Sequence, residues 1–301
     1  MAPLCWLGFR EGFAATPYAL VVGVAPNALM AALFLFYRAR GEQTFAYIFA
    51  ALGLMAFVAY VDAWLAIVGL AAGFPLEDTR LMAWSHAVGI DHRAILEWLA
   101  ARTPLGAILS KAYLLSVPMM FLAPAVLATT GQFERLKTFV WLYVVLLTAC
   151  VVISIVVPAK GFAVYEAPPA ELMARLPPGA STFYAKISEA YRSGALRTID
   201  PSLLEGVVIF PSFHTIMTLL ATYAFWRTRF LWLLSLAANG MVLFSVVPIG
   251  GHYVWDVVGG ALMFVAAARL APHGTEAPAS LRWRRAAPSE PDPAASNSSA
   301  A

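Results

Sequence analysis

Charged residues are scarce in this chain of 301 residues: only 12% are Asp, Glu, Lys or Arg, whereas 61% are hydrophobic. Soluble domains contain roughly 25% charged and about 45–50% apolar residues. A soluble core could not bury this much apolar surface, so a soluble globular protein is excluded. The lipid bilayer is expected to solvate much of the chain.

Three further absences narrow the class of protein. The only cysteines are Cys5 and Cys150, the second inside an apolar run, so a disulfide framework is not expected. No stretch of a soluble domain interleaves basic and aromatic residues, so nucleic acid is not an expected partner. Residues 1–16 contain Arg10 and Glu11 and lack a cleavage site of small residues, so the first membrane span is expected to direct insertion.

Long apolar runs, in contrast, are abundant. A helix needs about 20 apolar residues to cross the hydrocarbon core, and helices are the only spanning option for runs this apolar. Suitable runs occupy 17–37, 44–72, 105–129, 138–157, 208–226, 230–249 and 253–271. The first is the weakest, because Pro17 and Pro26 interrupt it. We expect an all-α polytopic membrane helix bundle with six to seven transmembrane helices.

Basic residues in short loops predict the orientation of this bundle, because Lys and Arg accumulate on the cytoplasmic side. If every run crosses, four basic sites share one side: Arg38 and Arg40; Arg135 and Lys137; Arg227 and Arg229; and Arg269 with Arg282, Arg284 and Arg285. The longer loops 73–104 and 158–207 are then expected outside. An Ala-rich composition and a basic tail suit a bacterial inner membrane, with the outer face in the periplasm.

Two segments differ from the spans. Residues 79–102 carry too many charges to cross but repeat apolar residues at helical spacing, which predicts an interfacial helix over 79–104. Residues 272–301 are rich in Pro, Ala and Ser, which predicts a disordered cytoplasmic tail. The expected organisation is N-terminal transmembrane helices over 1–78, the interfacial helix, a core over 105–271, and the tail.

Two of the five histidines stand in distinctive settings at the mouths of predicted spans. His214 lies in the motif FPSFHT (210–215), and His252 lies in GGHYVWD (250–256). The orientation derived from the loop charges places both motifs at the same outer level of the membrane.

These residue types suit phosphoryl transfer. His252 and Asp256 are four residues apart and share a helix face, so the carboxylate would fix the tautomer of the imidazole and stabilise its cation. His214, at the start of the predicted helix over 208–226, could donate a proton. Ser212 and the backbone N–H groups beside it form an anion-binding helix end. One imidazole would attack phosphorus while the other protonates the leaving oxygen.

The two motifs resemble those of the type-2 phosphatidic acid phosphatase superfamily of lipid phosphate phosphatases and phosphotransferases. Its members carry Pro-Ser-x-His and, after an intervening span, His-Tyr-x-x-Asp, here PSFH (211–214) and HYVWD (252–256). The resemblance covers roughly 105–271, which it identifies as the catalytic core. It implies a lipid phosphate as substrate, membrane lipids as partners, and neither a metal nor a cofactor.

The resemblance also implies a role for each motif residue. His252 would form a phosphohistidine, and His214 would be the general acid for the leaving group. Asp256 would orient His252. Ser212 and Gly251 would help to bind the phosphate.

The chain departs from the common pattern of this superfamily at several points. Phe213 stands where many members have Gly, Val246 follows Ser245 where many have Arg, and the earlier Lys-x6-Arg-Pro motif is absent. These departures resemble the branch of inositol phosphorylceramide synthases, which transfers a phospho-headgroup between lipids. Arg192 and Arg197, close to the first motif, are predicted to replace the missing cations, because a bidentate Arg suits a phosphate.

Two other interpretations of the motifs stay open. Two His and one Asp can bind zinc, although the chain has no HExxH motif and the Pro-Ser start favours an anion over a cation. A transporter or a non-catalytic membrane subunit would keep its activity in a His252→Ala variant.

Several polar residues outside the motifs are ambiguous. Asp62, within the second span, is either a functional intramembrane carboxylate or a group solvated near the outer headgroups. Tyr113, at the mouth of the third span, allows similar alternatives, as does Lys111. His86 and His92 are expected on a solvated face of the interfacial helix, as is Asp91.

Overall fold

The computed structural model describes residues 12–199, 208–228 and 231–272. The predicted disordered tail from residue 273 onward, together with Cys5 and Arg229, lies outside these residues. Within them the chain forms twelve helices and one parallel pairing of two short strands, β1 (Ala14–Ala15) and β2 (Thr198–Ile199). The predicted all-α class is confirmed.

Four helices within the described ranges are long and apolar enough to cross a bilayer: α2 (Pro17–Ala39), α3 (Gln43–Ala71), α6 (Thr103–Thr129) and α7 (Phe133–Val156). Three apolar helices are shorter: α11 (Phe213–Phe225), α12 (Leu231–Val246) and α13 (Val254–Leu270). They have 13, 16 and 17 residues, below the roughly 20 that a perpendicular span needs. The predicted count of six to seven transmembrane helices therefore stays a prediction.

The first predicted span is a continuous helix despite its prolines. Pro17 occupies the first turn, where a missing N–H costs nothing. The side chain of Thr16 accepts a hydrogen bond from the Ala19 N–H at 2.9 Å and caps this end. The ring of Tyr60 fills the space that Gly23 leaves by lacking a Cβ. Close packing on α3 therefore holds α2 in place.

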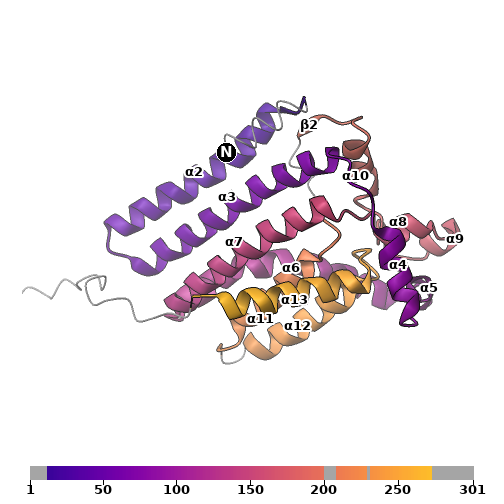
Figure 1. Cartoon of the computed structure of the whole chain (residues 1–301). Coiled ribbons are helices and arrows are strands. Elements are labelled where there is room, and N and C mark those ends of the chain that lie inside the picture. Colours follow the sequence, from indigo (N-terminus) through magenta and orange to yellow (C-terminus); the bar gives the residue numbers. More distant parts are fainter. Residues whose placement is uncertain (1–11, 200–207, 229–230, 273–301) are drawn as a thin grey trace, which may run out of the picture. The chain divides into compact units, whose positions relative to one another are not determined.

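The helices pack into one bundle around an apolar core. Helix α3 lies against α2, α6 and α7, and α11 lies against α6, α7, α12 and α13. Figure 1 shows α2, α3, α7 and α13 following one another across the bundle. The core includes Met55, Phe139 and Leu220, all inaccessible to solvent. Large apolar side chains are also exposed along α2, α6 and α12, which suits a surface that faces lipid.

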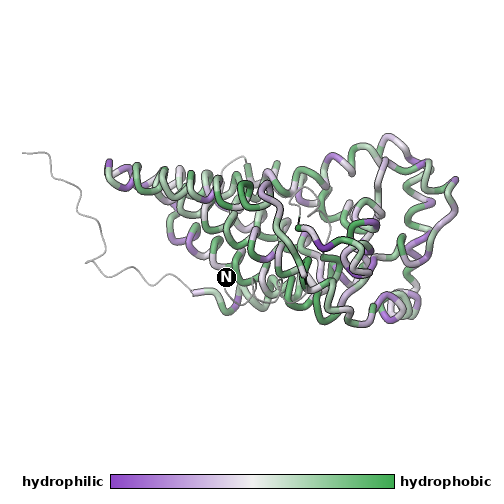
Figure 2. Tube along the Cα trace, turned by 90° about the horizontal axis from the view of Figure 1, so that it is seen from above, coloured by the Kyte–Doolittle hydropathy of each residue, from purple (hydrophilic) through white to green (hydrophobic). Residues whose placement is uncertain are grey.

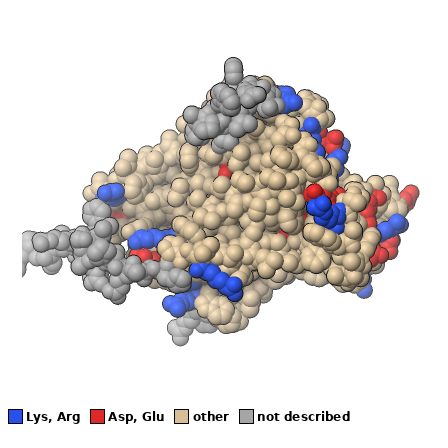
Figure 3. Space-filling view, in the orientation of Figure 1, with Lys and Arg blue, Asp and Glu red and all other residues tan. Residues whose placement is uncertain are grey.

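Most Lys, Arg, Asp and Glu side chains visible in Figure 3 lie toward the two ends of the bundle, and few lie between them. At one end, the Tyr47 ring at the start of α3 packs on Phe133 at the start of α7, 4.9 Å away. Arg135 donates to the Tyr223 carbonyl near the end of α11. The described residues of the predicted basic sites, among them Arg38, Arg135 and Arg227, thus share one end, whereas α11 and α13 start at the other.

Short helices cap this second end: α4 (Asp78–Ala87), α5 (His92–Ala100), α8 (Phe162–Glu166), α9 (Ala170–Met173) and α10 (Ala185–Arg192). Figure 2 shows more hydrophilic residues here than along the long helices. The single interfacial helix predicted over 79–104 is wrong, because the segment forms the two helices α4 and α5 and ends in the start of α6. Gly89 breaks it at a φ of +75°, and the Asp91 carboxylate accepts from the Ala94 N–H at 3.0 Å to start α5.

Candidate active site

A glycine turn positions His252 directly before α13. Gly251 adopts a φ of +76°, and a Cβ at this position would lie 2.7 Å from the Ser181 carbonyl oxygen, so the turn requires glycine. Its N–H donates to the Val247 carbonyl at 3.0 Å, and its own carbonyl accepts from the Phe162 N–H at 3.2 Å. Both backbone groups of Gly251 are thus paired within the protein, and its predicted role in phosphate binding stays a prediction.

The first turn of α13 joins His252 to Asp256. The distance from His252 Nδ1 to Asp256 Oδ2 is 3.2 Å, and both side chains are buried. The same carboxylate oxygen accepts from the Tyr253 N–H at 2.8 Å, which fixes its orientation. A proton on Nδ1 that points at the carboxylate leaves the lone pair on Nε2 free for a reaction. We infer this tautomer from the hydrogen bond.

His214 faces the same site from the first turn of α11. The centroids of the His214 and His252 rings are 6.2 Å apart. Tyr113, from α6, stacks on His214 at 4.0 Å with an interplanar angle of 17°, and its hydroxyl lies 3.1 Å from His214 Nδ1. The expected proximity of the two imidazoles is observed. Tyr113, ambiguous in the sequence, is part of the site.

Ser212 links the two motifs. Its N–H donates to the Asp256 carbonyl at 3.0 Å, and its side-chain oxygen accepts from the Thr215 N–H at 3.3 Å. A Cβ on Gly260 would lie 2.6 Å from the Ser212 carbonyl oxygen, so this glycine lets α13 approach α11 closely. The described residues provide no acceptor for the N–H of residue 213 or of His214. These groups at a helix N-terminus suit an anion.

The family of this chain follows from its similarity to known protein families. Residues 79–270, more than half of the chain, match the PAP2 superfamily, the type-2 phosphatidic acid phosphatases that the motifs resemble. The chain belongs to the PAP2 superfamily. Neither the search of curated proteins nor the search of solved structures found a match. Membership indicates phosphatase or phosphotransferase activity, and the long apolar helices fit an integral membrane protein.

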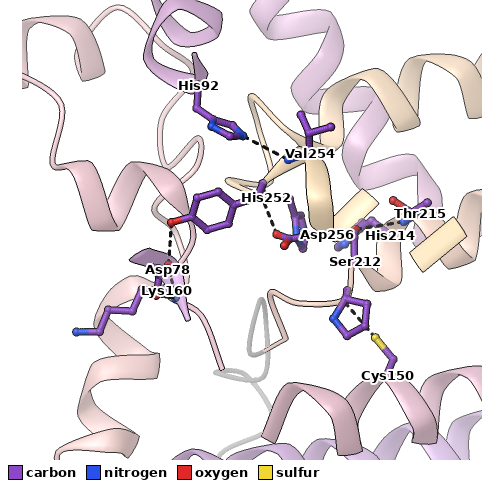
Figure 4. A network of polar contacts seen from close by, with 12 residues as sticks. Asp78, His92, Cys150, Lys160, Ser212, His214, Thr215, His252, Val254 and Asp256 are labelled. Carbon is purple, nitrogen blue, oxygen red and sulfur yellow. Dashed lines mark hydrogen bonds and ion pairs between the residues drawn. The ribbon is translucent and has the colours of Figure 1, made fainter. Parts of the chain in front are cut away.

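Polar groups from outside the two motifs, on Asp78 and His92, hold the residues that follow His252 (Figure 4). The Tyr253 hydroxyl donates to Asp78 Oδ1 at 2.9 Å. Both oxygens of Asp78 also accept from the Lys160 N–H. On the other side, His92 Nε2 accepts from the Val254 N–H at 3.3 Å. Helices α4 and α5 thus hold the start of α13 from the capped end.

The predicted solvated position of His92 is wrong. The residue is fully buried, with its ring stacked on Phe162 at 4.9 Å. Burial lowers its pKa from 6.5 to about 4, so it is neutral at pH 7 and can accept a hydrogen bond. Burial also raises the pKa of Asp78, although the donors from Lys160 and Tyr253 oppose this. Sequence reasoning missed Asp78, because its partners are 82 and 175 residues away.

The two arginines predicted to bind phosphate, Arg192 and Arg197, contact Phe74 and Phe13. Arg192 donates to the Phe74 carbonyl at 2.9 Å and lines a groove of about 520 Å³ with Lys160 and Lys186. The Arg197 guanidinium lies over the Phe13 ring, 5.1 Å from its centroid. Their role as phosphate ligands stays a prediction. Among the described residues, no group of three or more His, Cys, Asp or Glu is arranged to hold a metal ion.

Proposed function

We propose that this protein is an integral membrane enzyme that removes or transfers the phosphoryl group of an amphiphilic phosphate through a phosphohistidine on His252. The observation that carries the proposal is the pair of imidazoles 6.2 Å apart, with a buried carboxylate behind one of them. Both lie where apolar helices begin, so a lipid chain would stay in the bilayer while its phosphate meets the site.

The geometry supports two steps. First, His252 Nε2 attacks phosphorus, the bond from phosphorus to the ester oxygen breaks, and His214 gives a proton to the leaving alcohol. Then water or another hydroxyl attacks phosphorus, its proton passes to His214, and the P–N bond breaks with the electron pair returning to His252. Asp256 stabilises the positive charge that develops on His252. The Ser212 hydroxyl and the free N–H groups of α11 hold the phosphate oxygens.

The test compares purified wild type with His252→Ala and His214→Ala in the presence of EDTA. Phosphatidic acid, an isoprenoid diphosphate and an inositol phospholipid are the substrates. We expect loss of phosphoenzyme and of turnover in His252→Ala, and a fall of about 10²- to 10⁴-fold in kcat in His214→Ala, as for loss of a general acid. His86→Ala is the matched control, because this histidine is exposed. Full turnover in a folded His252→Ala variant would instead support a transporter or non-catalytic subunit.

A second candidate is transfer of a phospho-headgroup to a lipid hydroxyl, as in inositol phosphorylceramide synthases. The buried Val246 favours it, since many phosphatases of the superfamily have an arginine at this position. Product analysis with a labelled phospholipid separates the two reactions. Free phosphate supports a phosphatase, and a new phospholipid supports a transferase.

We also propose that the site faces the periplasm of a bacterial inner membrane. The supporting observation is that the basic turns lie at the end opposite to the starts of α11 and α13, because short basic loops stay in the cytoplasm.

A further inference from the structure

A second polar site lies beside His214, partly outside the region that matches the superfamily. A cavity of about 220 Å³ is bounded by α3, α7 and the start of α11, and its wall includes Asp62, Tyr143 and His214. The superfamily match begins at residue 79. Asp62 therefore comes from a helix that precedes the matched region.

Asp62 is placed at a considerable energetic cost. It is only 3% exposed and lies within α3, a largely apolar helix of 29 residues, where a carboxylate is expensive and usually functional. The Thr148 hydroxyl donates to its Oδ2 at 2.8 Å. This is the one hydrogen bond that the described part of the chain gives to the Asp62 side chain. Its other oxygen is therefore available to a ligand in the cavity.

The lining determines which ligand fits. A carboxylate only accepts hydrogen bonds, so it attracts hydroxyl groups and repels phosphate. The rest of the wall is mainly apolar, with Ala59, Ala63, Leu147 and Val151. The volume is several times the roughly 30 Å³ of one water in the liquid. A neutral alcohol with more than one hydroxyl suits this combination.

We propose that this cavity binds a polyol acceptor of the phosphoryl group. One hydroxyl of the polyol meets His214 and a second donates to Asp62. The inference rests on the proposed function and names its acceptor site. The reacting hydroxyl oxygen bonds to phosphorus, its proton passes to His214, and the P–N bond breaks with its electron pair returning to His252. Asp62 holds the neighbouring hydroxyl and does not exchange a proton.

The experiment measures how the phosphoenzyme divides between water and an added alcohol. Labelled phosphatidic acid supplies the phosphoryl group to the purified protein in detergent. The acceptors are monooctanoylglycerol, which is a lipid diol, glycerol, which is a soluble polyol, and 1-octanol, which has one hydroxyl. The readout is the ratio of phosphorylated alcohol to free phosphate. This ratio depends on the second step alone, so a change in the first step does not affect it.

Two variants and one control separate binding from folding. Asp62→Asn keeps an oxygen for Thr148, and Asp62→Leu removes the polar group at similar volume. Glu134→Gln is the matched control, an exposed carboxylate at the opposite end of α7. We expect the ratio for the polyols to fall about tenfold in both Asp62 variants, as for loss of a hydrogen bond to a charged group. The ratio for 1-octanol should stay constant. A larger fall for monooctanoylglycerol identifies the acceptor as a lipid, and a larger fall for glycerol identifies it as a soluble polyol.

A binding measurement without any phosphate donor separates this inference from the proposed function. Monooctanoylglycerol or glycerol should raise the unfolding midpoint of wild type and of Glu134→Gln more than that of either Asp62 variant. If wild type transfers no phosphoryl group but shows this difference, the proposed function fails and the polyol site stands. If wild type is active but neither the ratio nor the stabilisation depends on Asp62, the polyol site is overturned and the proposed function stands.

Discussion

At the scale of single residues, neighbouring groups fix the orientation and the tautomer of the His252 ring. Its Nδ1 faces a carboxylate that is itself fixed by the Tyr253 N–H. The second imidazole has a different environment, because a tyrosine hydroxyl rather than a carboxylate faces His214 Nδ1. The carboxylate holds the orientation of the His252 ring, whereas the tyrosine stacks on the His214 ring and places its hydroxyl at Nδ1. This difference suits a nucleophile and a proton donor, respectively.

The first prediction tests the carboxylate. In Asp256→Asn an amide N–H can face Nδ1, which favours the tautomer with the proton on Nε2, and that nitrogen cannot then attack phosphorus. We expect kcat for lipid phosphate hydrolysis to fall by about 10²- to 10⁴-fold. Asp91→Asn is the control, since this exposed residue only caps α5. A folded Asp256→Asn variant with the kcat of wild type would contradict the role of Asp256.

At the scale of elements, the site depends on how closely α13 approaches α11. Gly260 in α13 faces the Ser212 carbonyl, and Gly259 faces the ring of Phe210. These glycines place no Cβ between the two helices. The consequence is the direct hydrogen bond from the Ser212 N–H to the Asp256 carbonyl.

The second prediction concerns this contact. Gly260→Ala puts a Cβ 2.6 Å from a backbone oxygen, so the helices must separate, at a cost of about 1–3 kcal/mol. A shift of this kind should also lower kcat by at least about tenfold. Gly240→Ala is the matched control, because no atom lies within 4 Å of a Cβ there, and it should stabilise α12 slightly. Unfolding midpoints and kcat check both, and equal effects of the two substitutions would contradict the prediction.

The third prediction concerns the contact between α5 and α13. His92 is neutral in the folded protein, with its pKa lowered from 6.5 to about 4. Between these pH values the unfolded chain takes up a proton that the folded protein does not, so stability falls as the pH drops through this window. The loss is at most about 3 kcal/mol.

His92→Gln tests this contact, because its amide oxygen can accept from the Val254 N–H but does not titrate. The unfolding midpoint of wild type should fall more between pH 7 and pH 4.5 than that of His92→Gln. His86→Gln, at an exposed position, should keep most of the pH dependence of wild type, because burial rather than the charge of His86 is the main cause of the lowered pKa of His92. The same pH dependence in all three proteins would show that His92 is not the group responsible.

At the scale of the whole molecule, most charged side chains visible in Figure 3 lie toward the two ends of the bundle, and few lie between them. Helix α2 buries only Ala19 and Gly23, so its remaining surface is left for lipid. The fold therefore depends on the bilayer as a solvent. The site lies where the helix starts meet the polar cap. For the proposed function, this position would let an amphiphile present its phosphate without leaving the membrane.

The fourth prediction tests the placement of the two ends. In a Cys5→Ser background, Thr130→Cys marks the basic end and Glu171→Cys marks the capped end, both at exposed positions. The native Cys150 is buried. A membrane-impermeant maleimide added to intact cells should label Glu171→Cys alone, and Thr130→Cys only after permeabilisation. The reverse pattern would place the site in the cytoplasm, and labelling of both in intact cells would contradict a bundle that crosses the membrane.

The sequence by itself determined the helical class, the membrane environment and the two histidine motifs. Apolar composition, run length and residue spacing are local properties, and they do not depend on how helices pack. The break at Gly89 could also have been read locally, but the strong helical spacing of the apolar residues around it obscured it.

Only the tertiary structure decided which residues surround the motifs. Tyr113, Asp78 and His92 meet them across 101, 175 and 162 residues of chain, and Asp62 shares a cavity with His214 across helices. No periodicity encodes such contacts, because they depend on crossing positions set by side-chain shape, such as the missing Cβ of Gly260. The burial of His92 also depends on a contact that is distant in the sequence. The charge of the segment 79–102 indicated a solvated His92, whereas packing against Phe162 buries it.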